Sequence, residues 1–172
     1  MKASLILGFA LPVLAMASIA HAANQQKCDV QVDITDTDPK GTNVRAAPGG
    51  AIIAQLQNPG DGWIGVHVTG QSGDWYAIDR ATRVGSDLPP AGKIVFHGTG
   101  YLHKSMVGLS GMQNGGAIYA DHDVRSRPID LHAPGDQPVD LLGCWGDFLK
   151  VHVGKGIGWT KEACTNMNTT CA

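Results

Sequence analysis

Residues 43–48 (NVRAAP) open a series of three short motifs, and the same series recurs later in the chain. The first series continues with residues 74–79 (DWYAID) and 100–104 (GYLHK); the second consists of residues 123–128 (DVRSRP), 147–152 (DFLKVH) and 158–161 (GWTK). Each motif aligns with its counterpart without a gap, so the sequence predicts two copies of one small β module. Small β modules in tandem bind more often than they catalyse, although a fold alone does not fix a function.

Several runs of the chain alternate apolar and polar residues with the period of two that a half-buried β-strand requires. The clearest are residues 30–34, 63–68 and 149–153. Turn signals rich in Pro and Gly separate these runs. One-turn helices are expected only near residues 104–106 and 160–163. The sequence therefore predicts an all-β fold of short strands, as in a sandwich or a small barrel.

The first 22 residues have the features of a signal peptide. Lys2 supplies the positive start, residues 5–19 form an apolar run, and Ala20-His21-Ala22 fits the small-x-small cleavage pattern. The run is shorter than the roughly 20 apolar residues of a spanning helix, which argues against a retained membrane anchor. We expect cleavage near Ala22–Ala23 and a periplasmic or secreted protein of about 150 residues with no stable membrane insertion.

Charge and cysteine content restrict the partners and cofactors. The net charge is −2 and the basic residues are scattered, so no nucleic-acid or anionic-membrane footprint is present. Four cysteines in an exported chain favour a disulfide framework over a metal site, and no C-x-x-C or H-x-x-x-H spacing occurs. We expect no metal and no cofactor. The cysteines are Cys28, Cys144, Cys164 and Cys171, which allow three pairings.

The ordered motifs resemble those of the bacterial SH3 domain family. The resemblance rests on Asn-Val-Arg-x-x-Pro, on an acidic-aromatic strand start such as Asp74-Trp75, and on a closing Gly158-Trp159. It covers both copies and implies two tandem small SH3-like β-barrels, at residues 23–111 and 112–172. The first copy has 20 residues between its second and third motifs, against five in the second copy. This difference predicts a hairpin insertion near residues 80–99.

The resemblance also implies a disulfide arrangement. In such a barrel the strand that ends at Cys144 reverses twice before the tail, which should bring Cys144 close to Cys164 and Cys171. We therefore expect Cys144 to pair with one tail cysteine and Cys28 to pair with the other.

The candidate ligand-binding residues are three aromatic side chains and one arginine. Tyr119, Trp145 and Trp159 are candidates for an exposed aromatic surface, because large aromatic side chains contribute most at binding hot spots. A core role is an equal alternative for Trp159, since a small barrel has few large apolar side chains. Arg125 could contact a carboxylate, but Arg45 and Arg125 are better suited to tying down loop carbonyls.

Enzymatic interpretations are weaker. Cys144 with His152 could form a thiol nucleophile and base, but a disulfide would consume the thiol. Ser105 and Ser110, near His103, lie in no G-x-S-x-G motif. We expect no catalytic residues and no enzyme.

The resulting hypothesis is an exported, non-catalytic binding module. Its expected ligand, implied by the resemblance, is a cell-wall peptide or glycan of peptidoglycan, or a wall-associated protein segment. The alternative is a periplasmic inhibitor or assembly factor that docks onto a single envelope protein partner.

Overall fold

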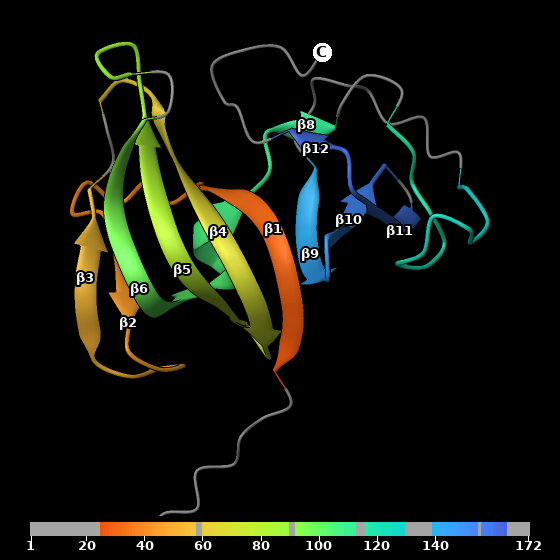
Figure 1. The fold of residues 1–172 in the computed structure, drawn as a ribbon, viewed down its shortest axis with the longest axis horizontal. Coiled ribbons are helices and arrows are strands. Elements are labelled where there is room, and N and C mark those ends of the chain that lie inside the picture. The colour runs from red at the N-terminus through yellow and green to blue at the C-terminus, as the bar shows by residue number, and fades with distance from the viewer. Residues whose placement is uncertain are drawn as a thin grey trace, which may run out of the picture.

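The computed structural model describes residues 25–57, 60–89, 92–112, 116–129, 139–154 and 156–164. The expected signal peptide lies outside these residues. The described part is almost entirely β-structure, which confirms the all-β prediction (Figure 1). Its elements are β1 (Gln26–Ile34), β2 (Thr42–Arg45), β3 (Ile52–Leu56), β4 (Trp63–Ser72), β5 (Trp75–Val84), β6 (Lys93–His103), the 3-10 helix η1 (Lys104–Met106), β7 (Val107–Gly108), β8 (Gly111–Met112), β9 (Asp140–Trp145), β10 (Phe148–Val153), β11 (Gly156–Thr160) and β12 (Ala163–Cys164).

The first unit is a seven-stranded sheet with the order β3-β2-β6-β5-β4-β1-β7. The sheet curls like half a barrel, with β3 and β7 as its two edges (Figure 1). Ile64, Val66 and Val68 are buried, as the alternation in β4 predicts, while His67 between them is only partly buried. Burial of the apolar core to which these side chains belong provides the main favourable free energy of the unit.

The expected insertion lengthens the β5–β6 hairpin. Pairing of β5 with β6 continues beyond the motif residues as far as Arg83 and Lys93. Residues on both sides of the hairpin tip, Arg83 and Lys93, therefore belong to one long β5–β6 hairpin. Two side chains of this extension, Ile94 and Val95, are exposed.

The second unit is smaller. It contains a three-stranded sheet, β11-β10-β9, and the short pair β12-β8. Leu149, Val151 and Val153 are buried, as their alternation predicts. The helix expected near residues 104–106 is present as η1, but the one expected near residues 160–163 is absent. The chain there enters β12 directly, because Ala163 pairs with Met112 of β8.

Strand pairing corrects the alignment of the first motif. Arg45 pairs with Tyr101 on the edge of β6 that faces away from β5. Trp159 is the counterpart of Tyr101 in the second copy, and Tyr119 pairs with it on the edge of β11 that faces away from β10. The structural counterpart of Arg45 is therefore Tyr119. The ungapped match with residues 123–128 is wrong in register, because that match lies in the loop that follows Tyr119.

Two glycines support this corrected alignment. A methyl group on Gly100 would lie 2.4 Å from Val44, and one on Gly158 would lie 2.2 Å from Ile118. Both distances are far below van der Waals contact, so each strand requires glycine where a β-branched side chain packs across it. Val44 directly precedes Arg45, just as Ile118 directly precedes Tyr119.

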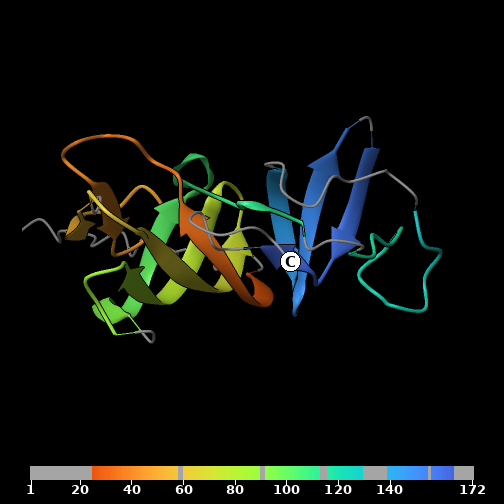
Figure 2. The same ribbon diagram turned by 90° about the horizontal axis from the view of Figure 1, so that it is seen from above.

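The two units lie side by side, with β1 of the first next to β9 of the second (Figures 1 and 2). Among the described residues, no helix is long and apolar enough to cross a membrane.

Candidate functional site

A disulfide joins the two units. Cys28 on β1 is bonded to Cys144 on β9, with a Cα–Cα distance of 5.7 Å. The expected pairing of Cys144 with a tail cysteine is therefore wrong. Two reversals do return the chain direction, but β9 and β11 occupy opposite edges of the three-stranded sheet, about 10 Å apart. Cys164 is also disulfide-bonded, and Cys171 lies outside the described residues.

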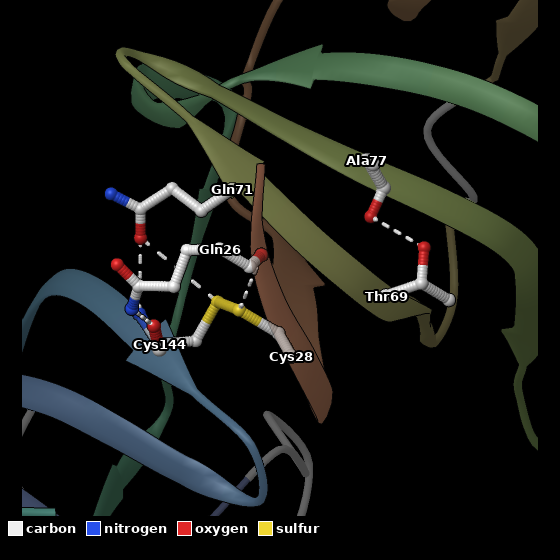
Figure 3. Close-up of a disulfide and its surroundings, with 6 residues drawn as sticks. All are labelled: Gln26, Cys28, Thr69, Gln71, Ala77 and Cys144. Atoms are coloured by element: carbon white, nitrogen blue, oxygen red, sulfur yellow. Dashed lines mark hydrogen bonds between the residues drawn. A yellow bond between two sulfur atoms is a disulfide. The ribbon is translucent and has the colours of Figure 1, made fainter. Parts of the chain in front are cut away.

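Two glutamine side chains complete the junction around this disulfide (Figure 3). The Gln26 amide donates a hydrogen bond to the Cys144 carbonyl, and the Cys144 N–H donates to Oε1 of Gln71 at 3.1 Å. The two side-chain amides thus form hydrogen bonds with the Cys144 carbonyl and N–H at the edge of β9, in place of the backbone of a neighbouring strand. Neither glutamine carries a sequence pattern that could have identified this role.

The backbone of β1 also bonds to the turn between β9 and β10. The Gly146 N–H donates to the Lys27 carbonyl at 2.9 Å, and the Asp29 N–H donates to the Gly146 carbonyl at 2.6 Å. Gly146 has φ +53°, a left-handed conformation that glycine adopts without strain. The junction is therefore held by backbone bonds, side-chain amides and a covalent link.

The second unit carries an aromatic cluster, which consists of Tyr119, His122, Trp145, Phe148 and Trp159. The His122 ring lies 4.6 Å from Trp145 and 5.3 Å from Trp159, between ring centroids. Tyr119 packs edge-on against Phe148 at 6.3 Å. The structure thus brings together the three aromatic residues that the sequence nominated, and His122, which sequence reasoning missed, connects two of them.

The two tryptophans differ in exposure. Trp145 is 48% exposed, whereas Trp159 is half-buried on the outer face of the sheet. Nζ of Lys150 lies 5.6 Å from the Trp159 ring, in a cation–π arrangement. Trp159 is therefore a surface residue that neighbouring side chains partly cover.

Arg125 lies in the loop that follows His122 and is 87% exposed. Its guanidinium forms an ion pair with Asp123 at 2.8 Å. Hydrogen bonds from Arg125 lower the pKa of Asp123 to about 2. Arg45 instead donates to the Gly50 carbonyl at 2.7 Å, which is the loop-tying role expected from its motif.

A second candidate site lies on the first unit. We call it the first groove; it is lined by Asp36, Asp38, Gly41, Asn43, Arg45, Trp75, His103 and Met106. The Trp75 and His103 rings meet edge-to-face at 5.2 Å. The groove therefore combines carboxylates, a guanidinium, an imidazole and an indole in one place.

The equivalent positions of the second unit are closed. Phe148 corresponds to Trp75, and it is only 5% exposed because other side chains cover it. Nζ of Lys161, the counterpart of His103, lies 4.6 Å from the Phe148 ring. Tyr119, the counterpart of Arg45, packs on the same ring. In the second unit, side chains occupy the space that is an open groove in the first unit.

The candidate catalytic groups have structural partners. The Cys144 sulfur is in a disulfide, so it is not a free nucleophile. Nδ1 of His103 accepts hydrogen bonds from Ser105 and caps η1. Within the described ranges, no group of three His, Cys, Asp or Glu side chains is placed to hold a metal ion.

One buried acid lies close to the junction. Asp33 on β1 is fully buried, and its Oδ2 accepts a hydrogen bond from Ser110 at 2.9 Å. Its Oδ1 has no hydrogen-bond partner. Burial raises the pKa of Asp33 to about 7, against a smaller opposing effect of the Ser110 hydrogen bond. Because Ser110 follows β7, this contact anchors the chain between the two units.

Comparison with protein families, with curated proteins and with solved structures found no match to this chain.

Proposed function

We propose that this chain is an exported, non-catalytic binding module built from two SH3-like units, and that it recognises a cell-wall peptide or glycan. The observation that carries the proposal is the first groove. Its equivalent in the second unit is filled by side chains, so the open groove is a feature of these residues rather than of the fold. The disulfide between the units suits the oxidising compartment that the proposal requires.

The charges in the first groove favour a mixed-charge peptide. Asp36 and Asp38 supply negative charge for an amine, while Arg45 has five N–H donors and commits one of them to the Gly50 carbonyl. Trp75 adds an apolar face for a side chain or backbone plane. A cell-wall peptide carries both free carboxylates and amines, which this combination can bind.

The test is binding of the mature chain to a wall peptide that carries no sugar. We expect Trp75→Ala to weaken that binding by about tenfold or more, as loss of a hot-spot aromatic does. Trp145→Ala is the matched control, because Trp145 is an exposed tryptophan outside the first groove. The proposal fails if purified sacculi do not retain the wild-type chain and the peptide does not bind.

The exposed apolar side chains of the first unit support a second candidate, docking onto a single envelope protein. Ile52 and Ile53 on the edge strand β3 and Ile94 and Val95 on the extended hairpin are each more than 40% exposed. An edge strand with such side chains can accept a partner strand. A pull-down that recovers one stoichiometric protein, without retention on sacculi, would favour this candidate.

A further inference from the structure

We propose that the junction between the two units is a second binding site, which takes a neutral N-acetylated sugar chain. The site is an open groove of about 580 Å³ lined by Gln25, Gln26, Lys27, Trp145 and Gly146, which we call the junction groove. Three lining residues come from β1 or the residue before it, one from the end of β9 and one from the turn that follows β9. Neither unit can form this groove alone.

The indole of Trp145 is the apolar surface of the junction groove. It remains 48% exposed although the His122 ring packs against it at 4.6 Å. A large aromatic side chain that is held in place and still exposed loses little conformational entropy when a ligand covers it. The C–H face of a pyranose ring is a flat apolar surface that fits an indole face.

The polar groups of the junction groove are mostly neutral amides. The Gln26 amide nitrogen bonds to the Cys144 carbonyl, which fixes the side chain and turns its oxygen away from the disulfide (Figure 3). This oxygen can accept a hydrogen bond from a hydroxyl or an acetamido N–H. Gln25 adds a second amide; among the described residues that line the groove, Lys27 is the only charged side chain and none carries a carboxylate. Amides beside an indole match the hydroxyl and acetamido groups of a sugar better than a strongly charged ligand.

The junction groove also differs from a site for proline-rich peptides. Such peptides dock between several aromatic side chains that form a grooved surface. Among the described residues that line the groove, Trp145 is the only aromatic one; Trp159, which also contacts His122, is not among them. The ligand proposed for the junction groove is therefore a sugar chain rather than a proline-rich peptide. This site rests on the proposed function for the cell wall as the source of the ligand, but it lies in a different groove and takes the glycan rather than the peptide.

The position of the disulfide explains how the junction groove is assembled. Cys28 directly follows Lys27, and Cys144 directly precedes Trp145, so the covalent bond lies between the two halves of the groove. The backbone bonds from Gly146 to Lys27 and from Asp29 to Gly146 set their register. Sugar binding should therefore depend on the oxidised state of this pair.

The experiment titrates the oxidised mature chain with a β-1,4-linked tetramer of N-acetylglucosamine and follows amide chemical shifts by NMR. We expect shifts centred on Trp145 and Gln26. Trp145→Ala should weaken the sugar affinity by about tenfold or more, whereas Trp145→Phe should retain part of it. Gln26→Ala should also weaken it, and Gln31→Ala, an exposed glutamine on the same strand outside the junction groove, should not.

Two further measurements separate this inference from its rivals. Trp75→Ala should leave sugar binding unchanged, so a failure of the first groove and a failure of the junction groove are distinguishable. Amide chemical shifts of Trp145→Ala that match those of the wild-type chain away from the junction groove show that this variant is folded. The inference is overturned if the wild-type chain does not bind the tetramer, if Trp145→Ala binds it normally, or if only a proline-rich peptide shifts the Trp145 resonances.

Discussion

The two units use equivalent backbone positions for different purposes. In the first unit Arg45, Trp75 and His103 line an open groove. In the second unit Tyr119 and Lys161 both pack on the Phe148 ring. The first unit has seven strands to provide a core, and the second has two very small sheets. The difference indicates that a large core leaves surface positions free for a ligand, while a small one uses the same positions for packing.

The largest effect we predict is on the unit with the smaller core. Replacing Cys28 and Cys144 by serine opens a link between residues 116 positions apart. Removal of a bridge that closes a loop of this length should lower the unfolding free energy by about 5 kcal/mol. Hydrogen exchange should show that β9–β11 lose protection before β4–β6. Equal loss of protection in both units would contradict the inference that the unit with the smaller core depends more on the disulfide.

The sequence was sufficient to predict individual strands, but it was insufficient to predict the contacts between distant strands. Alternation located β4 and β10, because the period of two along a strand is a local property. The register of Tyr119 depends on a strand far along the chain, and a chance match at residues 123–128 concealed it. Likewise, the partner of Cys28 and the roles of Gln26 and Gln71 arise where two units meet, which no local pattern encodes.

The candidate site shows the same division. Tyr119, Trp145 and Trp159 were found because large aromatic side chains are rare in this chain. His122, which links two of them, was indistinguishable from other loop histidines. The first groove was missed because its residues come from separate segments of the chain. The sequence around Trp75 also fits the start of a buried strand as well as it fits a binding residue. A groove is a property of the folded surface, so composition gives little signal for it.

The contact that anchors the chain between the units should make stability depend on pH. Burial raises the pKa of Asp33 to about 7 in the folded chain, from about 4 when unfolded. The stabilisation is therefore complete below about pH 4 and is lost as the pH rises to about 7, a change on the order of 4 kcal/mol. Denaturant unfolding at a series of pH values measures it.

Asp33→Asn is the control for this pH dependence. Asparagine keeps a side-chain oxygen for Ser110 but has no proton to lose. The variant should therefore show a much smaller fall in stability between pH 4 and 7. If the wild-type and variant curves run parallel, Asp33 is not the group that titrates.

The contrast between open and filled grooves predicts unequal costs for matched substitutions. Phe148→Ala should lower the unfolding free energy by about 3 kcal/mol, because this buried ring supports Tyr119 and Lys161. Trp75→Ala should cost clearly less, since its ring is partly exposed at the first groove. Chemical denaturation of the two variants measures both losses of unfolding free energy and shows which is larger. An equal cost would mean that Trp75 is a packing residue and that the first groove is incidental.

The smallest effect concerns a His–Asp pair that the two units carry in opposite orientation. In the first unit His67 of β4 bonds to Asp79 of β5 at 2.7 Å; in the second, Asp140 of β9 bonds to His152 of β10 at 3.0 Å. His67 has an additional partner, Asp29 of β1, at 2.8 Å. Burial alone would lower the pKa of His67, but the hydrogen bonds to Asp29 and Asp79 outweigh it and raise the pKa.

A raised pKa means that the folded chain binds this proton more tightly than the unfolded chain does. The stabilisation from His67 is therefore complete below its unfolded pKa, about 6.5, and is lost as the pH rises through the higher folded value. Asp29→Asn should lower the His67 pKa in an NMR titration of the imidazole protons. Because Asp29 is 81% exposed, solvent screening should keep the change in stability below about 1 kcal/mol. An unchanged His67 titration in this variant would show that Asp79 alone sets the pKa, and that the additional partner of the first unit has no electrostatic role.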